Sequence, residues 1–88
     1  MARRQSNMLI IASVILKHGQ NKVGYNEIEE ELKGVLTRKQ IMDGVMRLKK
    51  FDVLSTVEKK NEKGENVFSI TPRRINRTRE ILEEAELI

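Results

Sequence analysis

Cysteine and tryptophan are missing from this 88-residue chain, and histidine and proline occur once each. Without cysteine the chain forms no disulfides or thiolate metal sites, and one histidine cannot make a histidine cluster. The longest apolar run, MLIIASVIL at residues 8–16, falls well short of the roughly 18 residues of a membrane span. No small-residue cleavage site follows it, so we expect no signal peptide. These absences predict a soluble, intracellular (cytoplasmic) protein.

The patterns that support catalysis are missing as well. The sequence has no nucleophile–base pair and no Gly-rich phosphate loop. We therefore expect no enzyme activity, no metal, no cofactor and no small-molecule ligand. A chain of this length makes one small domain that buries about 60 to 65% of its unfolded surface. A second copy would help to stabilise such a thin core.

The charges are more informative in their distribution than in their sum. The chain has 17 basic and 13 acidic side chains, a mild positive excess. Residues 26–33 carry four glutamates against one lysine, whereas residues 38–50 carry five cations against one aspartate. Neighbouring segments of opposite sign indicate one surface that faces a polyanion and another that faces away. The alternative is that both are ordinary solvated helix surface.

Two helices are expected in the first 34 residues. The first begins at Ser6 or Asn7 and ends at Gly19, and its apolar surface is wide enough for a central or an intermolecular position. A loop with a short strand at residues 22–23 follows. The second helix is capped by Asn26, with Glu29 completing a capping box, and Gly34 ends it. Its glutamates suit the positive end of the helix dipole, which explains them better than a metal site does.

The helix at residues 38–50 has the clearest start signals. Thr37 and Gln40 have the spacing of a capping box, and Leu36 and Ile41 that of a hydrophobic staple. Ile41, Val45 and Leu48 would face the core, and Gly44 beside them would allow the acidic helix to approach closely.

Two β-prone runs and a last helix complete the chain. VLSTVE and NVFSIT are joined by a polar turn around Gly64, which predicts a hairpin. Thr71 and Pro72 have the arrangement of a cap and first helical position, so a helix is expected over residues 73–88.

The outward face of the helix at residues 38–50 is chemically suited to DNA. Its lysines could bind phosphates, its arginine and amide groups could read base edges, and its thioethers could lie against thymine methyls. The alternative is again a charged solvated surface. The candidate DNA-binding residues on this helix are Arg38, Lys39, Gln40, Met42, Asp43, Met46, Arg47 and Lys50.

The order of elements over residues 6–72 resembles the winged helix-turn-helix family of DNA-binding proteins. An acidic short helix, a turn, a basic helix and a hairpin with a basic tip carry the resemblance, most clearly in NEIEEELKGVLTRKQIMDGVMRLKKFDVL. It implies an α+β, mostly α, fold with three N-terminal helices, a β-hairpin wing and a C-terminal helix. Small regulators of this shape occur in archaea and in their viruses and plasmids. The recognition helix would be residues 38–50, in the major groove.

The resemblance also assigns a role to the hairpin. Residues 59–64, with Lys59, Lys60 and Lys63, would be the wing tip on the backbone or in the minor groove. Arg3 and Arg4, in a basic arm at residues 1–5, would either add DNA contacts or form a disordered solubilising end.

The last helix has its charges in an unusual order. Four arginines occupy its first half and glutamates its second, which opposes the helix dipole, so a partner is expected to compensate. Two antiparallel copies would place arginines beside glutamates and make a homodimer. Alternatively, the arginines grip DNA phosphates. The expected dimerisation residues are Ile75, Ile81, Leu82, Ala85 and Ile88.

Two function classes follow. The first is a sequence-specific transcription regulator that binds double-stranded DNA as a homodimer. The second is a protein-interaction adaptor in a transcription, replication or partition complex.

Overall fold

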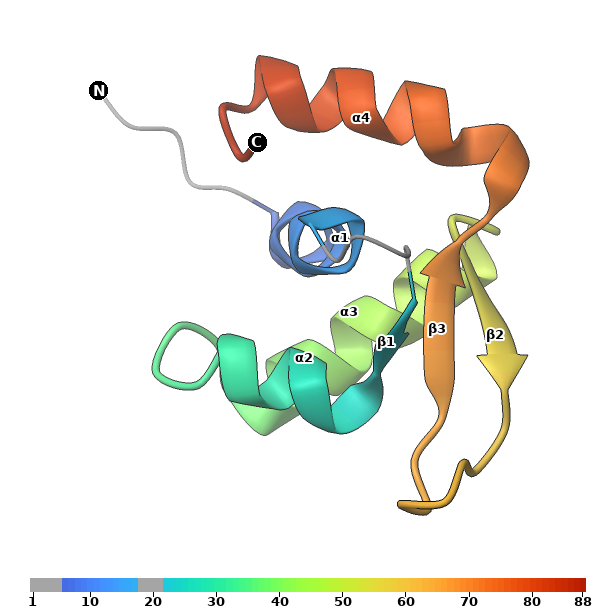
Figure 1. The fold of residues 1–88 in the computed structure, drawn as a ribbon. Coiled ribbons are helices and arrows are strands. Elements are labelled where there is room, and N and C mark those ends of the chain that lie inside the picture. The colour runs from blue at the N-terminus through green and yellow to red at the C-terminus, as the bar shows by residue number, and fades with distance from the viewer. Residues whose placement is uncertain (1–5, 18–21) are drawn as a thin grey trace.

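The computed structural model describes residues 6–17 and 22–88 of the chain. This part is α+β and mostly helical, as expected, with four α-helices and a three-stranded antiparallel sheet (Figure 1). The proposed arm at residues 1–5, and His18 and Gly19 at the expected end of the first helix, lie outside the described residues. In chain order the elements are α1 (Asn7–Lys17), β1 (Val23–Gly24), α2 (Tyr25–Glu31), α3 (Arg38–Lys50), β2 (Leu54–Glu58), β3 (Val67–Ile70), the 3-10 turn η1 (Pro72–Arg74) and α4 (Ile75–Glu84).

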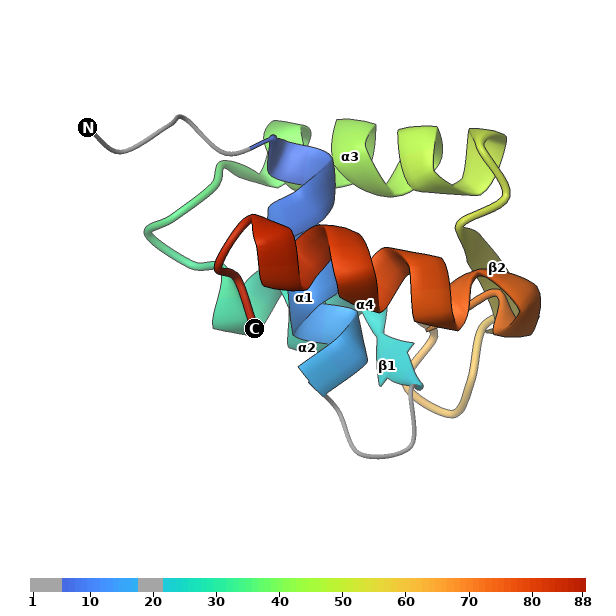
Figure 2. The same ribbon diagram turned by 90° about the horizontal axis from the view of Figure 1, so that it is seen from above.

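Helix α1 is the centre of the fold. Figure 1 shows α1 between α4 on one side and α2 and α3 on the other, with the sheet beside them. Figure 2 shows that α1 crosses α3 and α4 steeply. Fully buried aliphatic side chains come from several elements of this core: Ile11, Ile15, Ile28, Ile70 and Leu82. The wide apolar surface of α1 is thus explained by a central position.

Helix α3 begins and ends as the sequence predicts. The Gln40 backbone N–H donates to Thr37 Oγ1 over 3.1 Å, and the Thr37 N–H donates to Gln40 Oε1 over 2.8 Å. This reciprocal pair is the expected capping box. After Lys50 the chain turns through Asp52, whose φ is +62°, a left-handed conformation that aspartate adopts more readily than most residues.

Gly44 permits a close helix contact, but the partner differs from the one expected. A Cβ at position 44 would overlap the Cδ1 of Ile11, which belongs to α1. The expectation that the acidic helix α2 approaches here is therefore wrong. The reason is the central position of α1, which lies against the buried side of α3.

The start of α2 also differs from the sequence interpretation. Gly24 is the N-cap and has no side chain that could bond to the first turn. Asn26 already lies inside the helix. Instead the Asn26 backbone N–H donates to Glu65 Oε2 over 2.7 Å. A carboxylate from the hairpin thus replaces the predicted Asn26–Glu29 capping box, and it lies where a side chain at position 24 would be.

The hairpin β2–β3 is the larger part of the sheet. β3 is the central strand and pairs antiparallel with β2 and with the short β1. The β2–β3 register shifts between Thr56 and Glu58, which leaves Val57 in a bulge. Bulges strengthen strand twist. The expected short strand before α2 is present, at Val23–Gly24.

The last helix begins later and ends earlier than expected. Residues Pro72–Arg74 form a 3-10 turn, and α4 proper spans Ile75–Glu84. Thr71 does not cap the turn with its side chain, because its hydroxyl is 2.9 Å from the Ser55 hydroxyl of β2. No helix within the described residues is long and apolar enough to cross a membrane.

Candidate nucleic-acid interface

The outward face of α3 is open to solvent along its length. Every candidate residue on it is exposed except Gln40, which is half-buried. Met42 and Met46 are 50% and 65% exposed. Ile41, Gly44, Val45 and Leu48 are buried on the opposite side. The predicted division of the helix into a core face and an outward face is therefore present.

Two of the candidate side chains on α3 already have partners within the protein. The Arg38 guanidinium lies 2.9 Å from the Glu29 carboxylate of α2. The Gln40 side-chain oxygen accepts the Thr37 N–H in the capping box. Neither residue is as free to bind another molecule as its position in the sequence suggests. By contrast, none of Lys39, Arg47 and Lys50 forms an ion pair with a residue that the structure describes.

The side chain of Lys49, which is next to this face, lies over an aromatic ring of the sheet. Its Nζ lies 5.8 Å from the centre of the Phe68 ring of β3, within the range of a cation–π contact. This contact connects the last turn of α3 to the central strand.

The hairpin loop presents its three lysines on an ordered backbone. Lys59, Lys60 and Lys63 are all exposed. The Asn61 side-chain oxygen accepts the backbone N–H groups of Lys63 and Glu65 over 2.9 and 3.2 Å. The Asn61 carbonyl accepts the N–H of Gly64, whose φ of +75° suits a glycine. The loop therefore holds its cations on a defined turn.

Glu65 connects this loop to α2. Its side chain is buried and accepts hydrogen bonds from the Asn26 backbone N–H and the Asn61 side-chain amide. Sequence reasoning missed both Glu65 and Asn61. The spacing of Asn61 and Gly64 around a turn could have indicated the role of Asn61. Nothing local to Glu65 indicates that its partner is residue 26.

The loop and α3 lie on the same side of the molecule. In Figure 1 the hairpin extends beyond the sheet on the side of α1 where α2 and α3 lie, and α4 lies on the opposite side. The lysines of the loop are therefore separated from α4 by the core, whereas the last turn of α3 lies near α4, where Leu48 and Ile81 line one groove.

Tyr25 lies near the contact between α2 and α3. Its hydroxyl oxygen is buried and has no hydrogen-bond partner among the described residues. Burial raises the pKa of Tyr25 above its ordinary value. The nearby Glu29 carboxylate raises this pKa further, and the Arg38 guanidinium lowers it.

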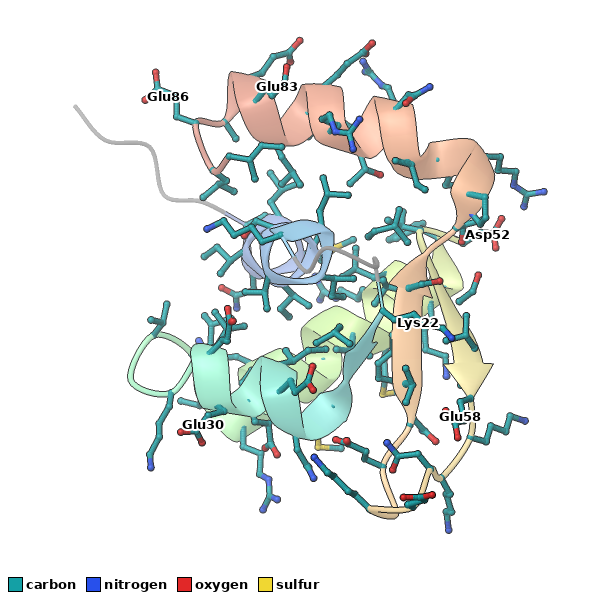
Figure 3. The ribbon with its side chains drawn as sticks, in the orientation of Figure 1. Lys22, Glu30, Asp52, Glu58, Glu83 and Glu86 are labelled. Carbon is teal, nitrogen blue, oxygen red and sulfur yellow. The ribbon has the colours of Figure 1, made fainter. Side chains whose placement is uncertain are left out.

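Three arginines of the turn η1 and helix α4 form ion pairs within the monomer. Arg73 and Arg74 both form ion pairs with Asp52, which lies in the turn after α3 (Figure 3). Arg77 lies 3.2 Å from Glu80 on the same helix. The unfavourable charge order of this helix therefore does not by itself require a second chain.

The dimerisation residues predicted on the last helix differ in how deeply they are buried. Leu82 is fully buried in the core of the monomer, so assigning it to a dimer seam is wrong. Ile75, Ile81 and Ala85 are half-buried, and Ile88 is 44% exposed. These residues do form an apolar stripe along the helix, but the side of the stripe that contains Leu82 packs against the core of the monomer.

The described residues contain no group of three or more acidic or histidine side chains placed to hold a metal ion. Comparison of the chain with family models, curated proteins and solved structures finds no match.

Proposed function

We propose that the protein binds double-stranded DNA as a transcription regulator of the winged helix-turn-helix type. Helix α3 would enter the major groove, and the hairpin loop would act as a wing on the phosphate backbone or in the adjacent minor groove. The observation that carries the proposal is the contrast among the cations. Arg38, Arg73, Arg74 and Arg77 are paired within the protein, whereas Lys39, Arg47 and Lys50 on the outward face of α3 form no ion pair with a described residue.

Different side chains on this face would contact the phosphates and the base edges. Lys39 and Lys50 suit phosphates, which fix the position of a helix in the groove but carry no sequence information. Arg47 can bind a guanine edge with two hydrogen bonds, and Asp43 can accept from a cytosine amino group. The exposed thioethers of Met42 and Met46 suit thymine methyl groups.

The hairpin loop would add affinity without sequence preference. Its lysines are exposed, and the Asn61 and Glu65 contacts fix the loop beneath them. A loop held in this way loses little conformational freedom on binding, so more of the attraction to phosphates remains as affinity.

A salt titration tests the proposal. If Lys39, Lys50, Lys59, Lys60 and Lys63 each neutralise one phosphate, affinity for duplex DNA should fall with a log–log slope of about −4.5. Replacing Lys60 with alanine should reduce that slope by about 0.9. Replacing the exposed Lys22, which lies by the sheet far from the hairpin tip (Figure 3), should leave it unchanged.

Selection of bound sequences from random duplexes then measures specificity. A regulator should enrich a defined motif. Absence of affinity for duplex DNA at low salt would contradict the proposal and favour the adaptor alternative.

A further inference from the structure

An apolar groove of about 260 Å³ lies between the N-terminal half of α1, the end of α3 and the middle of α4. Met8 and Leu9 come from α1, Phe51 and Val53 from the end of α3 and the turn after it, and Ile81 from α4. All the lining side chains are apolar except Thr78. The groove contains no residue of the hairpin loop, and it adjoins α3 at Met8, which also borders Gln40, Asp43 and Arg47.

Phe51 is the most conspicuous residue of the groove. The residue is 56% exposed, and it is one of only three aromatic residues in the sequence. Together with the apolar lining of the groove, Phe51 forms a contiguous exposed apolar surface, which is the kind of surface that marks an interaction site. Aromatic residues are enriched at the centres of protein interfaces, where they provide large contact areas.

The α4 edge of the groove carries one positive and one negative side chain, which could pair with the opposite charges of a second copy of the chain. At about 100° per residue, Arg77 and Glu84 lie within about 60° of Ile81 around the helix axis. Arg77 lies about 6 Å before Ile81 along the axis, and Glu84 about 4.5 Å after it. Both residues are exposed, and the bond of Arg77 to Glu80 is a solvent-exposed pair that can be exchanged.

We propose that this groove is the docking surface for a second copy of the chain. Two α4 helices would cross antiparallel, with the two-fold axis near Ile81. Arg77 of one protomer would then face Glu84 of the partner subunit, and the same contact would repeat across the axis. Phe51, Met8 and Leu9 would supply the apolar centre of the interface, and no buried core residue is required to move.

This position leaves the hairpin loop free, and none of the candidate DNA-binding residues of α3 lines the groove, although Met8 at its edge borders Asp43 and Arg47. Figure 1 shows α4 and the hairpin tip on opposite sides of α1. A dimer formed through the groove would therefore carry two exposed α3 helices related by two-fold symmetry. The inference does not depend on DNA binding, and either proposal can fail without the other.

The test is sedimentation equilibrium of the full chain over concentrations reaching the millimolar range. The unmodified chain should dimerise, and Phe51→Glu should weaken dimerisation about 30-fold or more, because it places a charge in the apolar centre. The matched control is Val57→Glu, another exposed apolar residue (45%), on the hairpin. This control should leave the dimer unchanged. Circular dichroism melting establishes that each variant is folded.

Charge reversal tests the antiparallel arrangement. Arg77→Glu and Glu84→Arg should each weaken the dimer about tenfold, since symmetry doubles every like-charged contact. The double variant should regain most of the lost affinity. A double variant no tighter than the single ones would overturn the arrangement. The proposal is overturned if the unmodified chain stays monomeric at all concentrations. This holds even if the apolar dye ANS binds to the groove, because dye binding shows only that the groove is exposed.

Discussion

The Glu65 carboxylate accepts the backbone N–H of Asn26 over 2.7 Å, so a residue 39 positions away caps the first turn of α2. The same side chain accepts from the Asn61 amide, which organises the hairpin loop. One buried carboxylate therefore holds two parts of the fold that local sequence leaves independent.

Replacing Glu65 should show how much this contact contributes. We expect Glu65→Ala to lower the free energy of unfolding by about 2 kcal/mol, because a charge-assisted cap and a loop contact are lost together. Glu65→Gln should cost about 1 kcal/mol, since the amide keeps an acceptor but not the charge. Urea denaturation measures both. Glu62→Ala, an exposed change in the same loop, is the control and should have little effect.

The contact between Gly44 and Ile11 predicts coupling between these positions. Gly44→Ala gains helix propensity worth about 1 kcal/mol but forces Ile11 aside, at a cost of about 1 to 3 kcal/mol. Ile11→Val removes the overlapping methyl and alone costs about 1 kcal/mol. The double variant should be more stable than the sum of the single effects predicts. Strict additivity in the double-mutant cycle would contradict this contact.

Arg47 and Lys60 should affect DNA binding in different ways. We expect Arg47→Ala to relax preference at one base position per half-site, a loss of about 1 to 3 kcal/mol of discrimination. Lys60→Ala should weaken all sequences similarly. Competition binding with single-base variants of a selected duplex distinguishes them. Equal loss of discrimination in both variants would contradict the separate roles of α3 and the loop.

Tyr25 should make stability depend on alkaline pH. Because the pKa is raised in the folded state, the unfolded chain loses its phenol proton first as the pH rises above about 10. The contribution of Tyr25 is therefore fully present below pH 10 and declines above it, with a slope of up to about 1.4 kcal/mol per pH unit. Tyr25→Phe should remove this component. At neutral pH the same change should cost little, since the buried hydroxyl has no partner among the described residues.

Asp52 should stabilise the junction of α3 with the last helix by a small, salt-sensitive amount. Its partners Arg73 and Arg74 are largely exposed, so Asp52→Asn should cost only about 0.5 to 1 kcal/mol. Asparagine also tolerates the positive φ of this turn, which keeps the comparison clean. The effect should shrink at high salt. An effect that is independent of salt would indicate that backbone strain, rather than charge, is responsible.

The sequence predicted α3 well because its signals are local. The capping box joins residues three apart, and the core face follows from helical periodicity alone. The start of α2 was wrong because its cap comes from the hairpin, at a distance that no local pattern encodes. Asn26 and Glu29 had suitable spacing, but the helix begins one residue before Asn26.

The candidate interface was predictable to a similar extent. Periodicity identified which α3 residues face solvent, since it needs no knowledge of neighbours. It could not show that Arg38 pairs with Glu29, because that contact depends on how α2 and α3 cross. Periodicity also could not predict that Leu82 is buried while Ile81 is half-buried. Both belong to one apolar stripe, and only the packing of the helix on the core determines which of them is covered.

The close approach of α1 to α3 at Gly44 has a consequence for evolution. A side chain at position 44 and a long one at position 11 would occupy the same space. Descendants of this chain should therefore change the two positions together, with a shorter residue at 11 preceding any replacement of the glycine. Such paired substitutions would preserve the packing of α3 against α1 while the outward residues of α3 diverge.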